Sequence, residues 1–189
     1  DPIDAKTDLE QANKFLAGKK IEKIRLMAEI SGDPLIISTK LAEVVPSVVS
    51  GEKALFLARR ADLNAKLSVL NQKLAQRIQQ IDETDVSEKT AYDTLSLVEQ
   101  QISIMEPLVN AGLSSETELL SLKRQAKDFE GRKDSAIASR SRIQSSILEV
   151  EEEIKATRQQ YITDSQSQLS AITSRIIEIE AKIPALQDR

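Results

Sequence analysis

The most constraining feature of this sequence is a row of mostly apolar positions that recurs in alternating steps of three and four residues. The row begins at Leu119, passes Ile154 and ends at Ile183, which amounts to about nine heptads. Such alternation places one continuous stripe along a helix and is typical of coiled coils. We therefore predict a single long helix over residues 116–183, weakened only at Gly131, where glycine costs about 1 kcal/mol relative to alanine.

A second row of the same kind precedes this one. It runs from Leu63 to Val109 and fades across the acidic stretch 82–88. The steps predict a second helix over residues 51–112. Pro107 marks a point where this helix frays or kinks, because proline has no backbone N–H to donate.

The short break between the two rows favours a turn, which we assign to residues 113–115. Gly112 suits the left-handed conformation that ends many helices. Ser115-Glu116-Thr117-Glu118 has the pattern of a capping box, which starts a helix. Two long helices joined by so short a connection run antiparallel.

Charges along the two helices agree with this antiparallel pairing. Residue i of the second helix should face roughly residue 227 minus i of the third, as an antiparallel coiled coil requires. Two matches of opposite charge follow: the acidic stretch 82–88 opposite Arg140 and Arg142, and the acidic run 149–153 opposite Lys73 and Arg77.

The start of the chain predicts one more helix, over residues 1–31, which ends at Gly32 and Pro34. Residues 32–50 form an irregular or partly helical connector. The expected fold class is all-α: a long antiparallel two-helix coiled-coil hairpin, with an additional shorter N-terminal helix packed near its base. These parts together make one α-helical hairpin domain.

Composition argues against catalysis and against cofactor or metal binding. The chain has no His and no Cys, and its five glycines are scattered. It therefore lacks the commonest general base, a thiol nucleophile, zinc-finger spacing and a phosphate-binding loop. The 26 basic and 30 acidic residues alternate along the chain, so no basic face for nucleic acid is expected. The sequence contains no run of 18 apolar residues, so no membrane span is expected. The first residue is Asp1, which indicates a trimmed piece without a signal peptide.

The predicted turn is unusual in being apolar and uncharged. Leu108, Val109, Ala111 and Leu113 would have little to pack against there. Two interpretations remain open at this stage. The residues either only staple the turn or form a small contact surface for another protein.

Three segments of the chain resemble, in order, segments of the hemolysin-exporter (HlyD) family of adaptor proteins. Residues 1–6 are similar to that family's LDPTDAQA segment, residues 108–120 to LVEKGLVSRTELL, and residues 183–189 to LPALEDR. In the family, the first and last of these segments border a lipoyl-like β domain. The resemblance implies that lipoyl halves, a β-barrel and a transmembrane helix lie outside this sequence.

The function implied by the resemblance is that of a periplasmic adaptor (membrane fusion) subunit of a type I protein secretion system, anchored in the inner membrane. Its implied partners are an inner-membrane ABC transporter and a TolC-like outer-membrane channel, with self-association into a ring, expected to be a hexamer. The residues implied to contact the channel are Leu108, Val109, Gly112, Leu113, Ser114, Ser115 and Glu116.

One position departs from the pattern of related adaptors, whose tip carries an Arg, a Leu and a Ser or Thr at fixed spacing. Leu108 and Ser115 match the last two, whereas Ile104 stands at the Arg position. The departure indicates an altered polar contact or a differently matched channel.

Two other functions are compatible with the same helices. An adaptor of a multidrug efflux pump would share the architecture, although the extra first helix and the final segment favour the protein-exporting branch. A cytoplasmic coiled-coil scaffold or tether would instead bind its partners along the flanks of the hairpin. The hairpin contains nothing that specifies an exported substrate.

Overall fold

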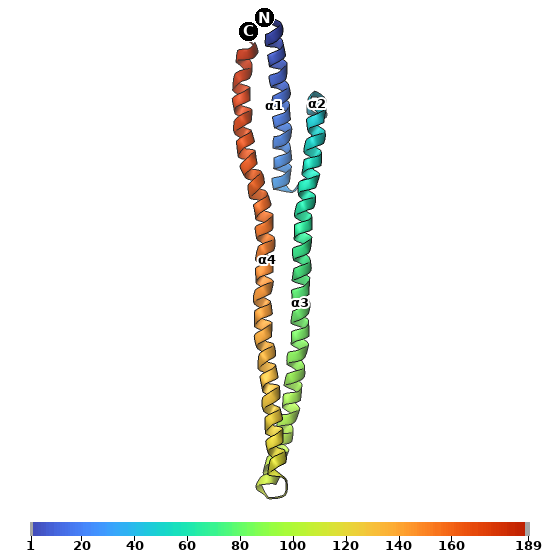
Figure 1. Cartoon of the computed structure of the whole chain (residues 1–189), viewed down its shortest axis with the longest axis vertical. Helices are drawn as coiled ribbons and strands as arrows, with labels where there is room; N and C mark the ends of the chain where they lie inside the picture. The colour runs from blue at the N-terminus through green and yellow to red at the C-terminus, as the bar shows by residue number, and fades with distance from the viewer. Residues whose placement is uncertain (1, 188–189) are drawn as a thin grey trace. The chain divides into compact units, whose positions relative to one another are not determined.

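The computed structural model describes residues 2–187 of the chain, with side chains from 7 to 186. This part of the chain is all-α and contains no strand. Its helices are α1 (Pro2–Ser31), α2 (Thr39–Val44), α3 (Pro46–Asn110) and α4 (Glu116–Gln187) (Figure 1). No helix within this part is long and apolar enough to cross a lipid bilayer. Asp1, Asp188 and Arg189, which belong to the first and last of the family-like segments, lie outside the described residues.

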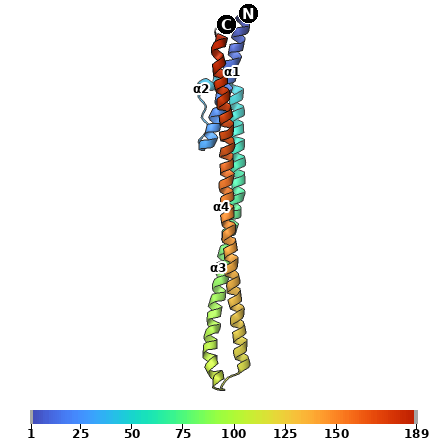
Figure 2. The same ribbon diagram turned by 90° about the vertical axis from the view of Figure 1, so that its left-hand side faces the viewer.

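The chain divides into two compact units, and α3 and α4 contribute to both. The two-helix unit comprises residues 70–153. The three-helix unit, named for its three long helices, comprises the described residues of 1–69 and 154–189 and also contains the short α2. Within the two-helix unit, α3 and α4 run antiparallel and are joined by the turn (Figure 2). Its buried apolar side chains come from both helices: Ala91, Leu95, Val98, Leu119, Ala136 and Val150.

Ion pairs across the two-helix unit confirm the register predicted from the charges. The expected partner of Lys73 is position 154, and the observed partner is Glu153, with 3.2 Å between Nζ and Oε2. Arg140, expected near position 87, lies 3.2 Å from Asp85 and 3.6 Å from Glu88. The pairing is therefore correct to within about half a helical turn.

Two members of the predicted charge matches pair differently. Arg77 donates a hydrogen bond to Gln80 at 2.8 Å rather than meeting the acidic run of α4. A partner three residues away on the same helix face is always within reach, so it competes well with one across the seam. Arg142 forms no ion pair within the described part of the chain.

Helix boundaries differ from the sequence-based ones chiefly at prolines. α3 begins at Pro46 rather than at residue 51, because proline fits the first helical position, where its missing N–H has no partner to lose. α4 continues past Ile183 through Pro184 to Gln187. α3 likewise continues through Pro107 and ends at Asn110 instead of 112.

The three-helix unit packs α1 against the N-terminal part of α3 and the C-terminal part of α4. Leu16 of α1 clusters with Ile176 and Ile179 of α4, while Ile21 and Leu26 are completely buried. Lys20 pairs with Glu180 at 2.8 Å on the edge of this seam. α1 ends at Ser31, and the next residue, Gly32, forms a left-handed cap with a φ of 79° and an N–H that donates to the Ala28 carbonyl at 2.9 Å. The connector includes the six-residue α2.

Candidate docking surface at the α3–α4 turn

A Schellman motif ends α3 and forms the turn. Gly112 adopts a φ of 73°, as predicted for the helix terminator. Its N–H donates to the Val109 carbonyl at 2.9 Å, and the N–H of Leu113 donates to the Leu108 carbonyl at 2.8 Å. These two bonds satisfy carbonyls that the end of a helix would otherwise leave unpaired. The turn is therefore a defined structure rather than a loose loop.

This motif exposes two leucines at the turn. The Leu113 side chain is 77% exposed and that of Leu108 is 42% exposed. Gly112, Ser115 and Glu116 are also exposed, whereas Val109 and Ser114 are half-buried. Of the predicted contact residues, Val109 and Ser114 thus face partly into the helix seam, and the others lie on the surface.

Ser115 does not take the part that the capping pattern predicts, and its neighbour Ser114 contacts α3. The Ser114 hydroxyl lies 2.9 Å from the sulfur of Met105, which connects the turn to α3. The Ser115 carbonyl accepts the Leu119 N–H at 3.3 Å. In the described part of the chain, the Ser115 hydroxyl and the Glu118 carboxylate make no hydrogen bond. The predicted capping box is therefore not formed, and its two side chains remain available at the surface.

The apolar surface continues from the turn along α3. Ile104 is 69% exposed and Leu97 is 60% exposed. Steps of seven and four residues connect Leu97, Ile104 and Leu108, so all three lie on one helix face, separate from the buried stripe. Sequence reasoning missed Leu97, although a second heptad-spaced apolar row beside the core row would have revealed it.

Three acidic residues lie near this surface, and one of them is paired. Glu106 pairs with Lys123 of α4 at 2.8 Å. Glu116 and Glu118 lie in the first turn of α4, where the helix dipole favours negative charge. An exposed apolar surface of this kind is suited to contact another protein.

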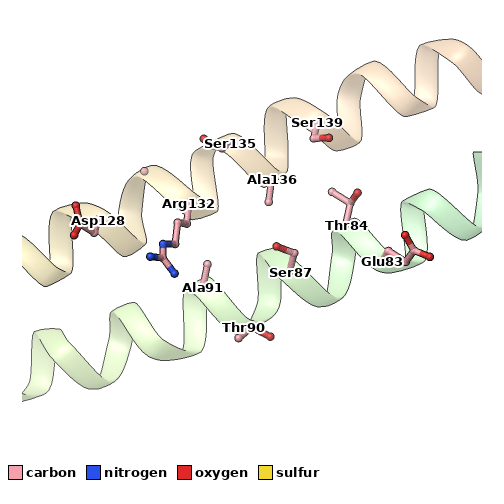
Figure 3. Close-up of a pocket in the computed structure, with 11 residues that line it drawn as sticks. Glu83, Thr84, Ser87, Thr90, Ala91, Asp128, Arg132, Ser135, Ala136 and Ser139 are labelled. Carbon is pink, nitrogen blue, oxygen red and sulfur yellow. The ribbon is translucent and has the colours of Figure 1, made fainter.

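The two-helix unit also contains an open groove of about 840 Å³ between α3 and α4 (Figure 3). Small and hydroxyl-bearing side chains line much of it, including Thr84, Ser87, Ala91, Ser135 and Ser139. The groove lies where the apolar stripe of α3 fades. Within the described residues, no three His, Cys, Asp or Glu side chains are arranged to hold a metal ion.

These features define a class of protein: an antiparallel α-helical hairpin that presents an uncharged turn and carries a third helix on part of its length. Comparison with known families agrees, because the family described as "AprE, long alpha-helical hairpin" matches residues 5–189. The chain belongs to this family.

Two individual proteins show the same likeness. The type I secretion system membrane fusion protein PrsE of Rhizobium meliloti (strain 1021) is 25% identical over 195 residues, covering 100% of this chain and 43% of PrsE. The chain thus spans less than half the length of this relative. The crystal structure of the soluble domain of LipC, a membrane fusion protein of a type I secretion system, has a TM-score of 0.89. It covers 97% of this chain and 89% of the LipC chain at 19% identity, which establishes the common fold.

Proposed function

We propose that this chain is the hairpin of a periplasmic adaptor subunit of a type I protein secretion system. In this proposal the whole protein is anchored in the inner membrane and works with an ABC transporter there. The turn between α3 and α4 docks onto a TolC-like outer-membrane channel, and several copies, expected to be six, form a ring. Membership of the AprE hairpin family and the likeness to PrsE support the assignment to a type I secretion system.

The observation that carries the docking role is the exposed apolar turn. Leu108 and Leu113 are held on the surface by a hydrogen-bonded motif whose geometry does not depend on a partner. Burying two leucines on docking releases about 25 cal/mol for each Å² of apolar surface removed from water. The interpretation as a mere staple does not account for a leucine that is 77% exposed.

Export by the full-length protein tests this proposal. Leu108→Asp and Leu113→Asp should each abolish export of the cognate substrate, because a carboxylate in an apolar contact is left desolvated and unpaired. Circular dichroism of the hairpin should remain unchanged, since both side chains are exposed. Leu57→Asp is the matched control: it makes the same change at a leucine of α3 that is 65% exposed and should leave export intact.

Cross-linking identifies the partner directly. The chain has no cysteine, so Leu113→Cys carries a single thiol-reactive photo-cross-linker at the turn. We expect it to capture the outer-membrane channel, and the same label at Leu57→Cys not to. Undiminished export by both aspartate variants, or capture of the channel from Leu57 alone, would contradict docking through the turn.

A further inference from the structure

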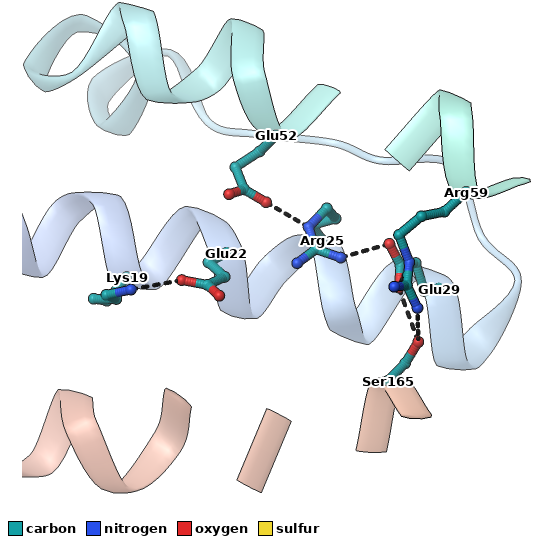
Figure 4. Close-up of polar contacts among 7 residues, drawn as sticks. All are labelled: Lys19, Glu22, Arg25, Glu29, Glu52, Arg59 and Ser165. Carbon is teal, nitrogen blue, oxygen red and sulfur yellow. Dashed lines mark hydrogen bonds and ion pairs between the residues drawn. The ribbon is translucent and has the colours of Figure 1, made fainter. Parts of the chain in front are cut away.

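A buried cluster of charges in the three-helix unit joins all three of its long helices (Figure 4). Arg25 of α1 bonds Glu29 one turn later, with 2.6 Å between Nη1 and Oε1, and also pairs with Glu52 of α3. The second oxygen of Glu29 lies 3.2 Å from Nε of Arg59 on α3 and accepts the Ser165 hydroxyl of α4 at 2.8 Å. The side chains of Arg25 and Glu29 are only 2% and 0% exposed.

Stability alone does not explain such a cluster. Removing charges from water is costly, and well-packed apolar residues of similar size are often at least as stabilising as a buried ion pair. A better-supported use of buried polar groups in helical assemblies is to specify one register among several that apolar contacts allow. The question is whether α1 faces such an ambiguity.

The apolar ladder of α4 leaves the position of Leu16 ambiguous. Leu16 packs beside Ile176 and Ile179, within a ladder that also includes Ile172 and Ile183. A displacement of one heptad would set Leu16 beside Leu169 and Ile172, or beside Ile183 and Leu186. The ladder therefore offers Leu16 a similar apolar surface in all three positions. The completely buried positions of Ile21 and Leu26 would receive Lys14 and Lys19 in the first displacement and Ala28 and Asp33 in the second.

The space beyond the end of α1 does not block such a displacement either. A groove of about 320 Å³ begins beside Ile30, Ser31 and Gly32 and continues along Leu63 and Leu67 of α3. The groove therefore leaves room for a displacement of α1 toward Leu63 and Leu67, and it does not bear on the opposite displacement.

The charges distinguish the registers. α1 runs parallel to α3, with Arg25 beside Glu52 and Glu29 beside Arg59, and the two α3 positions are one heptad apart. Sliding α1 by one heptad along α3 would put Arg25 beside Arg59. Sliding it the other way would put Glu29 beside Glu52. Both displacements bring like charges together in a buried site, which is strongly unfavourable.

We propose that the Arg25–Glu29–Glu52–Arg59 cluster is a register lock, which helps to fix the position of α1 along the hairpin by opposing both one-heptad displacements. This inference does not depend on the proposed function. It predicts that exchanging the charges on α1 alone favours the displaced positions, because Arg25→Glu would then match Arg59 and Glu29→Arg would match Glu52.

Cysteine cross-linking with a short bismaleimide measures the register of this cysteine-free chain. Lys20→Cys with Glu180→Cys reports the observed register, since these side chains meet at 2.8 Å. Asn13→Cys or Met27→Cys, each with Glu180→Cys, reports a displacement of one heptad in either direction. In the parent sequence, the first pair should exceed the other two by at least about tenfold, which corresponds to about 1.4 kcal/mol.

The double exchange Arg25→Glu/Glu29→Arg should invert this preference. Adding Glu52→Arg and Arg59→Glu should restore it, because the quadruple variant again has opposite charges in the observed register. The matched control, Glu10→Lys/Lys14→Glu, exchanges an exposed α1 pair that meets at 2.7 Å and should keep the parent preference.

Each outcome of this experiment bears on the lock. The lock is supported if the double exchange inverts the cross-linking preference and the quadruple variant restores it. It is also supported if the double variant shows no preference among the three cysteine pairs and the quadruple variant restores the parent preference. The lock is wrong if the double exchange keeps the parent cross-linking pattern. It is also wrong if the quadruple variant behaves like the double.

Discussion

Gly112 and Gly131 show how the same residue type has opposite consequences at two positions. A Cβ at either position would meet no atom within 4 Å, so steric crowding does not distinguish them. Gly112 has a φ of 73°, which side chains disfavour, whereas Gly131 lies within the helix α4. Backbone conformation alone therefore sets the effect of a substitution.

We predict that Gly112→Ala lowers the free energy of unfolding by about 1 kcal/mol. Gly131→Ala should raise it by about 0.5–1 kcal/mol, because alanine is the better helix former. Urea denaturation followed by circular dichroism measures both. Equal changes in the free energy of unfolding for the two substitutions would show that stability does not depend on the left-handed conformation of Gly112.

Tyr161 lies beside the register lock, and its ionisation makes the stability of this unit depend on pH. Burial raises the pKa of Tyr161, and the Glu29 carboxylate raises it further, which outweighs the opposing effect of Arg59. The guanidinium of Arg59 lies 5.4 Å from the centroid of the Tyr161 ring. Arg25 also keeps its charge: burial lowers the pKa of Arg25, but its bonds to Glu52 and Glu29 raise it by more.

The raised pKa of Tyr161 predicts a loss of stability in alkali. The unfolded chain releases the phenol proton near pH 10.0 while the folded chain still holds it. Stability from this group is therefore complete below about pH 10 and declines as the pH rises through the folded pKa. Thermal unfolding from pH 9 to 11 should show a smaller decline for Tyr161→Phe. Tyr92→Phe, at a side chain that is 60% exposed, is the control, and identical declines in both variants would contradict the assignment.

At the level of elements, cross-helix charges align α3 with α4 in the two-helix unit. Arg140 meets Asp85 and Glu88 with side chains that are 28–42% exposed. Partly exposed pairs contribute about 0.2–1 kcal/mol each, and solvent screening keeps them at the lower end. Their value is in alignment, because a displaced hairpin would lose several pairs at once.

Reversing the central charge tests this alignment. Arg140→Glu should lower the free energy of unfolding by about 1 kcal/mol, since it replaces two attractions with repulsions. Adding Asp85→Lys and Glu88→Lys should recover most of the loss. Arg142→Glu, at a neighbouring position without an ion pair, should change stability little. A loss that the compensating lysines do not recover would mean that Arg140 acts through packing, not through charge.

Across the whole molecule, apolar burial is distributed unevenly. The three-helix unit contains completely buried apolar side chains, Ile21 and Leu26. The two-helix unit has an open groove beside Thr84, Ser87 and Ser135. Segments that bury little apolar surface open more readily, so backbone protection should follow the same division.

Hydrogen exchange measured by mass spectrometry checks this expectation. Peptides that cover residues 84–91 and 131–139 should exchange faster than those that cover 20–28 and 172–180. The exposed turn is left out of the comparison, because fast exchange there would reflect its position outside the helices and not the burial of apolar side chains. Uniform protection across the four helical segments would contradict a weak section in the hairpin.

The sequence was sufficient for the long helices, the turn between them and their register. Heptad spacing predicted both long helices, Gly112 predicted the turn, and the Lys73 and Arg140 pairs followed from counting outward from that turn. Spacing did not locate the start of α3 at Pro46 or the end of α4 at Gln187. A proline near a helix end is compatible with the helix either stopping or continuing. Apolar residues at the turn were visible, but only the Schellman geometry shows which of them are exposed.

The tertiary structure alone decided where α1 lies. The sequence contains Arg25, Glu29, Glu52, Arg59 and Ser165 as ordinary members of charged or polar helices, and the bonded pair Glu29 and Ser165 is 136 residues apart. Nothing local distinguishes Glu29 from a solvent-exposed glutamate. Their pairing requires three segments to meet, and a buried charge is tolerated only where the others are already in place. Periodicity determines which face of a helix is buried, whereas the position of one helix along another depends on such contacts between distant residues.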